Sequence, residues 1–417
     1  MWCHSQLLLL VVWHSARAWA QCQSLQCLPA EYNPDIELDA PHLIRKYGYP
    51  VETHTVTTAD GFILTLHRIP HGRKVSKTSA DGTGNRIENE IKSKEPVLMQ
   101  HGLLASSACW ILAPPEKAPA YIMADAGYDV WLSNSRGNHY SRNHTHLSPD
   151  DKHFWDFSWD EMGSLDLPAV IDYILATTRH EQLYYIGHSM GTTIFFACMA
   201  TKPEYNSKVK AMFGLGPVAT VGHVTSPIKY LAPITSTIEE LLELLGDYEF
   251  LPHNENFIKW TEYICDSFEY EEIMCMNAVF FLTGYDAAQI NMTWLPVIFG
   301  HTPEGTSIRT LAHYAQEILN GQFQHYDFGK TENMRRYNQT TPPLYDLSRV
   351  NVPVVLMWGK NDLLADPKDV ALLAEKLPNL LVSYKVPLPK FNHIDFIWGI
   401  DAGRYVYRVI LKYMKHL

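Results

Sequence analysis

The pentapeptide Gly187-His188-Ser189-Met190-Gly191 is the feature that most constrains the fold of this 417-residue chain. It follows an apolar run at 183–186 and precedes a helix-like run at 192–200. Strand, sharp turn and helix in that order are the context of a nucleophile elbow, in which a serine occupies a strained turn. The two glycines leave room where strand and helix crowd together, and the helix N-terminus supplies positive potential beneath the hydroxyl. The sequence therefore predicts a catalytic serine, Ser189, rather than a structural turn.

The base and the acid that would activate Ser189 are predicted from the order of the chain. A serine hydroxyl is a poor nucleophile unless a base removes its proton and a third group orients that base. After an elbow these partners follow in the order Asp or Glu, then His. Asp362 lies just beyond a buried strand-like run at 352–358, and His393 follows the last such run, at 381–386. This pattern predicts that Asp362 and His393 complete a triad with Ser189.

Other residues of the same types have simpler interpretations. The chain contains 20 histidines, but His393 is the one in the final loop, between the last strand-like run and a terminal helix. Asp366 is the nearest rival of Asp362, but it precedes Pro367 and is expected to cap the helix that begins there. Asp395 is expected to be a local hydrogen-bonding partner.

The oxyanion of an acyl-transfer reaction is normally stabilised by two backbone N–H donors. Enzymes with this elbow take one from the residue after the nucleophile, here Met190, and the other from a loop that follows an early strand and carries an H-G motif. Residues 96–100 are the predicted strand, and His101-Gly102-Leu103-Leu104 follows it. Leu103 is the predicted second donor, with Leu104 as the less favoured neighbour. A plain strand-to-loop turn is the alternative.

In these motifs the chain resembles the acid lipase family, the group that contains gastric lipase and lysosomal acid lipase. The resemblance runs from about residue 35 to about residue 410. It implies an α/β-hydrolase fold, with a mostly parallel central sheet flanked by helices and an inserted, mainly helical cap with a mobile lid. It also implies hydrolysis of neutral lipid esters, with triacylglycerols and cholesteryl esters as the known substrates. Besides the elbow and the H-G segment, the matching segments are Tyr47-Gly48-Tyr49-Pro50, Thr58-Ala59-Asp60-Gly61-Phe62-Ile63-Leu64, Asn134-Ser135-Arg136-Gly137-Asn138, Phe154-Trp155-Asp156-Phe157-Ser158, Asp166-Leu167-Pro168-Ala169 and His393-Ile394-Asp395-Phe396-Ile397-Trp398-Gly399.

Two features depart from the family pattern. Family members usually have glutamine at the position of Met190; the backbone N–H is unchanged, but any hydrogen bond from that side chain is lost. The polar stretch at 71–95 is longer than usual and is predicted to be a surface loop between two early strands.

The alternation of strand-like and helix-like runs divides the chain into four parts. Residues 1–20 are a predicted signal peptide, residues 21–217 the first part of the α/β-hydrolase core, residues 218–345 the cap and lid, and residues 346–417 the second part of the core. Such alternation favours a mostly parallel sheet with helices on both faces. Apolar runs between 245 and 285 are predicted to include a lid whose movement would uncover Ser189 and expose a surface for a lipid droplet. A static cap is the alternative.

Two further strands and one helix are predicted in the first part of the core. The strands are expected at 128–132 and 209–213. The helix-like run at 167–178 is expected to have Asp166 as its N-cap and Pro168 in its first turn.

The amino-terminal segment and the charge indicate a secretory-pathway protein, secreted or lysosomal. An apolar core at 7–13 and small residues at 18 and 20 suit a signal peptidase, although no Lys or Arg precedes that core. The alternative, a membrane anchor, needs about 20 apolar residues, and no later run is long enough to span a bilayer. The net charge of −11 and the lack of a basic cluster argue against nucleic acid as a partner.

Because a secreted protein passes through an oxidising compartment, its cysteines can form disulfides. The resemblance implies a disulfide between Cys265 and Cys275, which would pin a loop over the active site. Cys22 and Cys27 could close a small ring, with the connectivity left open by the sequence, and Cys109 and Cys198 are expected to be buried thiols. The sequence has no C-x-x-C motif or metal-ligand cluster, so we predict no metal site and no cofactor.

Three sequons for N-glycosylation are present. They begin at Asn143, Asn291 and Asn338. Any one of them could be vacant, and the family pattern favours Asn291.

Together these residues predict a lipase that acts on lipid esters at a lipid–water interface through an acyl-enzyme. A broader carboxylesterase is the nearest alternative. A serine peptidase of the same fold would use the same triad, but would more often carry a large extra domain or a charged site for a peptide terminus. A non-catalytic binder usually has a broken triad. The apolar cap and the complete triad argue against these last two classes.

Overall fold

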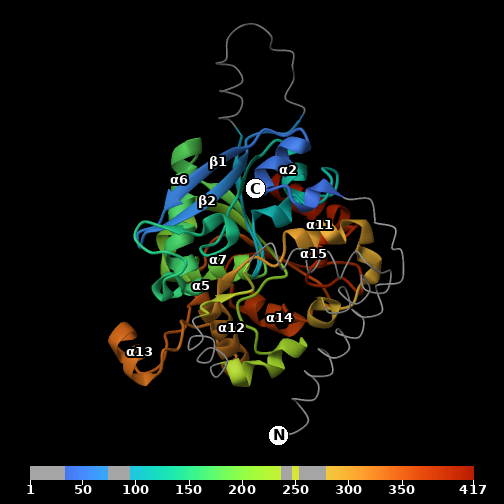
Figure 1. Cartoon of the computed structure of the whole chain (residues 1–417). Helices are drawn as coiled ribbons and strands as arrows, with labels where there is room; N and C mark the ends of the chain where they lie inside the picture. Colours follow the sequence, from blue (N-terminus) through green and yellow to red (C-terminus); the bar gives the residue numbers. More distant parts are fainter. Residues whose placement is uncertain (1–32, 74–93, 236–246, 253–278) are drawn as a thin grey trace, which may run out of the picture.

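The described part of the chain is built around one sheet. The computed structural model describes residues 33–73, 94–235, 247–252 and 279–417. The strand order is β1-β2-β4-β3-β6-β7-β10-β11, with β5 paired to β2. Neighbours from β4 to β11 are parallel, whereas β1, β2 and β5 pair antiparallel at one edge. The predicted mostly parallel sheet is therefore confirmed (Figure 1). The strands of this sheet are β1 (Glu52–Thr57), β2 (Phe62–Ile69), β3 (Pro96–Gln100), β4 (Asp129–Leu132), β5 (Asn143–His144), β6 (Leu183–His188), β7 (Val209–Leu215), β10 (Val354–Trp358) and β11 (Leu380–Lys385).

Helices and short turns connect these strands. The α-helices are α2 (Ala40–Lys46), α4 (Pro119–Asp125), α5 (Trp159–Glu161), α6 (Leu167–Thr178), α7 (Met190–Thr201), α11 (Leu295–Gly300), α12 (Ile308–Asn320), α13 (Lys330–Tyr337), α14 (Pro367–Lys376), α15 (Asp395–Trp398) and α16 (Arg408–Met414). Short 3₁₀ turns are η2 (Pro34–Ile36), η3 (Ser107–Trp110), η4 (His139–Ser141), η5 (Lys152–Trp155), η7 (Pro203–Lys208), η8 (Pro227–Tyr230), η9 (Ala232–Ile234), η10 (Ala287–Gln289), η11 (Met292–Trp294) and η12 (Leu347–Arg349). Two π turns, η6 (Met162–Asp166) and η13 (Gly403–Tyr407), and a small pair of strands, β8 (Glu249–Phe250) and β9 (Thr306–Ser307), complete the described elements.

Two apolar cores, one on each face, sandwich the sheet. Along β6, Tyr184 and Ile186 point into one core, and Leu183 and Tyr185 point into the other. Helices α4, α15 and α16 contribute to the first core, and α6, α7 and α14 to the second. Because both faces are covered, the parallel strands β3, β4, β6, β7 and β10 are buried along nearly their whole length, whereas the edge strand β11 alternates between half-buried and exposed residues. The loops at their carboxyl ends are where such a sheet normally carries its site.

Most predicted elements lie where the sequence indicated them. The strands expected at 96–100, 128–132, 183–186, 209–213, 352–358 and 381–386 correspond to β3, β4, β6, β7, β10 and β11, and the helix expected at 167–178 is α6. Asp366 caps α14 as predicted, because its carboxylate accepts a hydrogen bond from the Lys368 N–H at 2.8 Å.

The predicted N-cap role of Asp166 is wrong. The backbone of this residue is helical, because the π turn η6 joins α5 directly to α6, and its side chain makes no capping hydrogen bond within the described residues. Its carboxylate instead accepts hydrogen bonds from the Arg136 guanidinium, at 2.9 Å from Nε and 2.6 Å from Nη2.

Several predictions concern residues that the structure does not describe. The signal peptide at 1–20, the Cys265–Cys275 disulfide, the Cys22 and Cys27 ring and most of the predicted lid lie outside the described residues. In the described part of residues 218–345 the larger elements are α11, α12 and α13, and the four-part division of the chain stays a prediction. None of the helices within the described ranges has the length and apolar character needed to cross a membrane.

A buried guanidinium ties the edge of the sheet to α6. Besides Asp166, Arg136 donates to Asp60, which lies in the turn between β1 and β2, at 2.7 Å from Nη1. The guanidinium also lies 4.1 Å from the centroid of the Phe62 ring. Three segments far apart in the sequence are thereby joined at one cation. Removing that cation would leave the buried carboxylate of Asp166 without its partner.

We expect Arg136→Met to lower the free energy of unfolding by about 3–5 kcal/mol, because a buried charge loses its partner. Urea denaturation would measure the change. Arg335→Ala is the control: that guanidinium pairs with Glu332 on the exposed face of α13, so its loss should leave the unfolding midpoint unchanged. Equal midpoints for both variants would contradict this role of Arg136.

Candidate active site

Ser189 sits at the strained turn between β6 and α7. Its backbone has φ +52° and ψ −120°, a conformation that costs a non-glycine residue about 1–3 kcal/mol. The crossing of β6 and α7 is tight, since a Cβ added to Gly191 would lie 2.4 Å from the Gln100 carbonyl oxygen of β3. Glycine at 191 therefore permits the approach that holds Ser189 in its turn. The predicted elbow geometry is present.

The predicted acid and base contact each other directly. His393 Nδ1 lies 2.8 Å from Asp362 Oδ2, and the two residues are 4% and 1% exposed. The other carboxylate oxygen of Asp362 accepts hydrogen bonds from the backbone N–H groups of Leu364 and Ala365 at 2.9 and 2.8 Å. A carboxylate oxygen accepts, so Nδ1 of His393 is the donor in this hydrogen bond. Nε2 is buried and makes no hydrogen bond within the described residues.

The end of β7 brings the elbow and the acid–base pair together. The Ser189 N–H donates to the Leu215 carbonyl at 3.0 Å. A Cβ added to the next residue, Gly216, would lie 3.0 Å from His393 Nδ1 and 3.2 Å from Asp362 Oδ2. Consecutive residues of one strand end therefore contact the nucleophile turn and the acid–base pair. The three predicted triad residues converge at one edge of the sheet.

His188 links the elbow to the loop of His393. Its Nε2 lies 2.9 Å from the His393 carbonyl oxygen, and the two rings are 4.9 Å apart. Burial lowers the pKa of His188 to about 3, so the ring is neutral and Nε2 donates its proton to that carbonyl. Sequence reasoning treated residue 188 as the variable position of the motif and missed this contact.

The loop after β3 passes against the nucleophile. A Cβ added to Gly102 would lie 3.1 Å from the Ser189 Cβ. His101 Nε2 accepts the Ser135 N–H at 3.0 Å, so its Nδ1 donates to the Gly102 carbonyl at 2.8 Å. Burial lowers the pKa of His101 to about 4, which keeps this neutral tautomer. Because the peptide is trans, holding the Gly102 carbonyl turns the Leu103 N–H to the opposite side.

The two predicted oxyanion donors belong to different segments, one to helix α7 and the other to the loop after β3. Met190 is the first residue of α7 and is buried. Leu103 follows Gly102, and the next residue, Leu104, has φ +57°. The contact of Gly102 with Ser189 agrees with a donor from this loop, and the assignment of Leu103 and Met190 stays a prediction.

A buried carboxyl from the middle of the chain supports the same loop. The Glu304 N–H donates to the Leu104 carbonyl at 2.8 Å, and its carboxyl accepts the His139 N–H at 3.2 Å. Glu304 is 1% exposed, and burial raises its pKa to about 8. The sequence contains no local signal for this residue, because the contact joins positions 200 apart.

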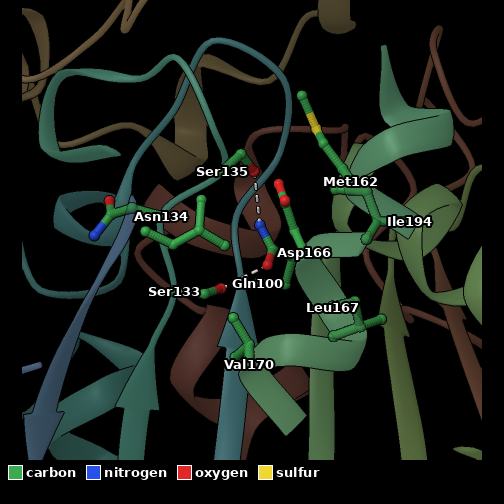
Figure 2. A pocket seen from close by; sticks show the side chains of 10 residues that line it. Gln100, Ser133, Asn134, Ser135, Met162, Asp166, Leu167, Val170 and Ile194 are labelled. Carbon is green, nitrogen blue, oxygen red and sulfur yellow. Dashed lines mark hydrogen bonds between the residues drawn. The ribbon is translucent and has the colours of Figure 1, made fainter. Parts of the chain in front are cut away.

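A small pocket lined by both polar and apolar side chains lies between the end of β3 and helix α6. In Figure 2 the Gln100 side chain lies between two serines, accepting from the Ser133 hydroxyl at 2.6 Å and donating to the Ser135 hydroxyl at 3.0 Å. None of the predicted triad residues lines it. We interpret it as structural support, since the backbone carbonyl of Gln100 is the atom on which Gly191 packs.

The remaining predicted sites have mixed outcomes. Cys109 and Cys198 are buried free thiols, as predicted. Asn143 and Asn338 are exposed and Asn291 is half-buried, and glycosylation at all three stays a prediction. In the part of the chain that is described, no three His, Cys, Asp or Glu side chains gather as metal ligands would.

Comparisons with known proteins cover nearly the whole chain. Residues 40–113 match the family described as a partial alpha/beta-hydrolase lipase region, and residues 95–245 match the alpha/beta hydrolase fold. The chain is 44% identical to gastric triacylglycerol lipase of Mus musculus, over 92% of this chain and 93% of that protein. It is 41% identical to lipase member K of Homo sapiens, over 92% of each. A crystal structure of a Sulfolobus solfataricus protein shares the fold with a TM-score of 0.55 at 16% identity, over 85% of this chain and 90% of that one.

The raised pKa of Glu304 sets the sign of a pH effect on stability. Its pKa is about 8 in the folded chain against an ordinary value of 4.5, so between these values the folded state holds the extra proton. The free energy of unfolding therefore falls as pH rises through that window. Relative to the wild type, Glu304→Gln should gain stability across it, on the order of 3 kcal/mol at pH 7.

Urea denaturation at a series of pH values would measure this difference. Glu332→Gln is the matched control. The pKa of Glu332 is lowered to about 2 by hydrogen bonds from Arg335 and Arg336, so above about pH 6 its carboxylate is ionised in both the folded and the unfolded state. Its difference from the wild type should not change with pH there. If the difference in the free energy of unfolding between Glu304→Gln and the wild type were also independent of pH, the assignment of a neutral buried carboxyl would be refuted.

Proposed function

This chain belongs to the acid lipase family of α/β-hydrolases and is a carboxylic ester hydrolase; on that premise we propose that Ser189, His393 and Asp362 form the triad that hydrolyses its ester substrates. One observation carries this proposal. His393 is bonded to Asp362 and its buried Nε2 has no hydrogen-bond partner among the described residues, while the end of β7 contacts both this pair and the turn of Ser189. This arrangement supports a role for Nε2 as the base for the Ser189 hydroxyl, with the proton of His393 on the other nitrogen.

The proposed reaction is acyl transfer in two steps. His393 Nε2 takes the proton of the Ser189 hydroxyl as its oxygen attacks the ester carbonyl, and Asp362 stabilises the imidazolium that forms. The N–H groups of Leu103 and Met190 hold the oxyanion. His393 then gives its proton to the departing alcohol, which leaves an acyl-enzyme. Water attacks this ester with His393 again as base, and the fatty acid and free Ser189 are released.

We propose neutral lipid esters, triacylglycerols or cholesteryl esters, as the substrates, met at a lipid–water interface. Two segments beside the triad support this. The Leu363 carbonyl accepts the Ser226 N–H at 2.9 Å, and the Leu363 N–H donates to the Thr283 carbonyl at 3.3 Å. Both segments expose large apolar side chains, as surfaces that bind lipid do. These side chains are Tyr230, Leu231, Ile234, Phe281, Leu282 and Tyr285.

We further propose that the protein acts in the secretory pathway, as a secreted or lysosomal enzyme, with residues 218–345 as its cap. The exposure of the sequons at Asn143 and Asn338 supports this, since an oligosaccharide transferase needs an accessible asparagine. Burial of Cys109 and Cys198 also suits an oxidising compartment, because neither thiol is accessible to form a mixed disulfide.

Ser189→Ala tests the proposed function. Hydrolysis of triolein and cholesteryl oleate emulsions should fall by about 10⁴-fold or more, because the nucleophile is lost while the fold is kept. The ratio of the two wild-type rates would give the substrate preference. Ser207→Ala, which removes an exposed hydroxyl bonded to the Glu204 carbonyl, is the control and should hydrolyse both at the wild-type rate. Undiminished turnover by a folded Ser189→Ala protein would refute the triad.

A further inference from the structure

The acid and the base of the triad are each preceded by an asparagine, and both asparagines reach the same short segment. Asn361 precedes Asp362, and its Nδ2 donates to the Tyr285 carbonyl at 3.0 Å. Asn392 precedes His393, and its Nδ2 donates to the Gly284 carbonyl at 2.6 Å. Two loops that meet at the Asp362–His393 hydrogen bond are thus also joined to consecutive carbonyls of a third segment. We call the Asn361 and Asn392 side chains and the carbonyls of residues 284 and 285 the asparagine clasp.

The side-chain oxygen of Asn392 accepts hydrogen bonds within its own loop, and its side-chain nitrogen donates to the clasp. Its side chain is fully buried, and Oδ1 accepts the backbone N–H groups of Ile394 and Asp395 at 3.0 and 3.1 Å. Its own backbone N–H donates to Asp395 Oδ2 at 2.7 Å. The oxygen end of the amide therefore shapes the loop of His393, and the nitrogen end ties that loop to Gly284.

Asn361 joins the loop of the acid to that of the base. Besides Tyr285, its Nδ2 donates to the Lys390 carbonyl at 3.0 Å, and its backbone N–H donates to the Phe391 carbonyl at 3.2 Å. The Leu363 N–H, on the other side of Asp362, donates to the Thr283 carbonyl at 3.3 Å. Both neighbours of the acid in the chain are thus held to residues 283–285.

The backbone at Gly284 makes this close contact possible. Its φ is +115°, and a Cβ added there would lie 2.0 Å from the Asn361 carbonyl oxygen and 3.0 Å from the Asn392 Cβ. The segment approaches both loops so closely that a side chain would collide with them. Gly284 is therefore the point at which the clasp can be opened without replacing either asparagine.

We propose that Asn361 and Asn392 are positioning residues for the triad, which fix the loops of Asp362 and His393 against residues 283–285. The inference rests on the proposed function. His393 Nε2 makes no hydrogen bond within the described residues, so the bond from Nδ1 to Asp362 and the packing of its loop set its direction. A rotation about that bond would move Nε2 away from the serine oxygen. Because the clasp holds the loops on both sides of the bond, it limits this rotation.

Three variants open the clasp from different sides: Asn361→Ala, Asn392→Ala and Gly284→Ala. We expect each to lower kcat about 10- to 100-fold on a soluble short-chain ester, with KM within about 2-fold of the wild type, since a small misplacement of a reacting group has costs of this size. The rate of phosphonylation by a fluorophosphonate should fall in parallel. Rates are taken per active site, counted from the end point of that labelling, so that loss of folded protein does not enter.

Asn333→Ala is the matched control. Asn333 is a fully buried asparagine on α13 whose amide joins the segments before and after that helix, accepting the Phe328 N–H at 2.9 Å and donating to the Thr340 carbonyl at 3.1 Å. Its replacement should lower the melting temperature and leave kcat per site unchanged. The double variant Asn361→Ala/Asn392→Ala should lose little more than the larger single loss, because the two amides act on one geometry.

Asn392→Asp separates the two ends of the amide. It keeps the oxygen that accepts from Ile394 and Asp395, and loses the donor to Gly284. We expect its limiting kcat, read from the plateau of the pH profile, to fall as in Asn392→Ala. Wild-type kcat per site in the three clasp variants would overturn the inference while leaving the proposed function intact. Activity retained by Ser189→Ala would instead overturn the proposed function.

Discussion

The left-handed backbone of Ser189 is the constraint on which the rest of the structure depends. A serine held at φ +52° stores strain, and that strain persists because the surrounding packing leaves the turn no alternative. Helix α7 must cross β3 so closely that Gly191 rests on the Gln100 carbonyl. The buried strands β3 and β6, covered on both faces by apolar side chains, supply the rigid base for that crossing. Hydrogen bonds with the buried hydroxyls of Ser133 and Ser135 hold the side chain of Gln100 at the end of β3.

Buried neutral histidines position the backbone around this turn. His101 holds the Gly102 carbonyl, and His188 holds the His393 carbonyl. In both, burial lowers the pKa far enough that the ring stays neutral and its one N–H has a fixed direction. His393 differs from them, because its proton lies towards Asp362 and its other nitrogen is left without a partner in the described residues. Histidine thus serves as a fixed donor at two of these positions, and at the third it carries the nitrogen that we propose as the base.

The sequence predicts those features that depend on chain order and local patterns. Ser189, Asp362 and His393 could be placed because each follows an apolar strand, and strand ends of a parallel sheet meet at one edge. The clasp and Glu304 could not, because their contacts join residues such as 284 and 392 that no local pattern relates. Asp166 shows the limit of local rules. A favourable N-cap position was overridden by the Arg136 guanidinium, a partner 30 residues away that offers charged hydrogen bonds.

The middle of the chain and the α/β core do not act as independent parts at the site. Glu304 supports the loop of Leu104, and residues 283–285 contact the loops of the acid and the base. All of these supports lie between the two halves of the core in the sequence. Without them, the loop after β3 and the loops of Asp362 and His393 would lose the hydrogen bonds that join them to this part of the chain. Phe281 and Tyr285 expose apolar side chains beside the clasp, so the surface that we propose for lipid is covalently continuous with the segment that we propose to position the triad.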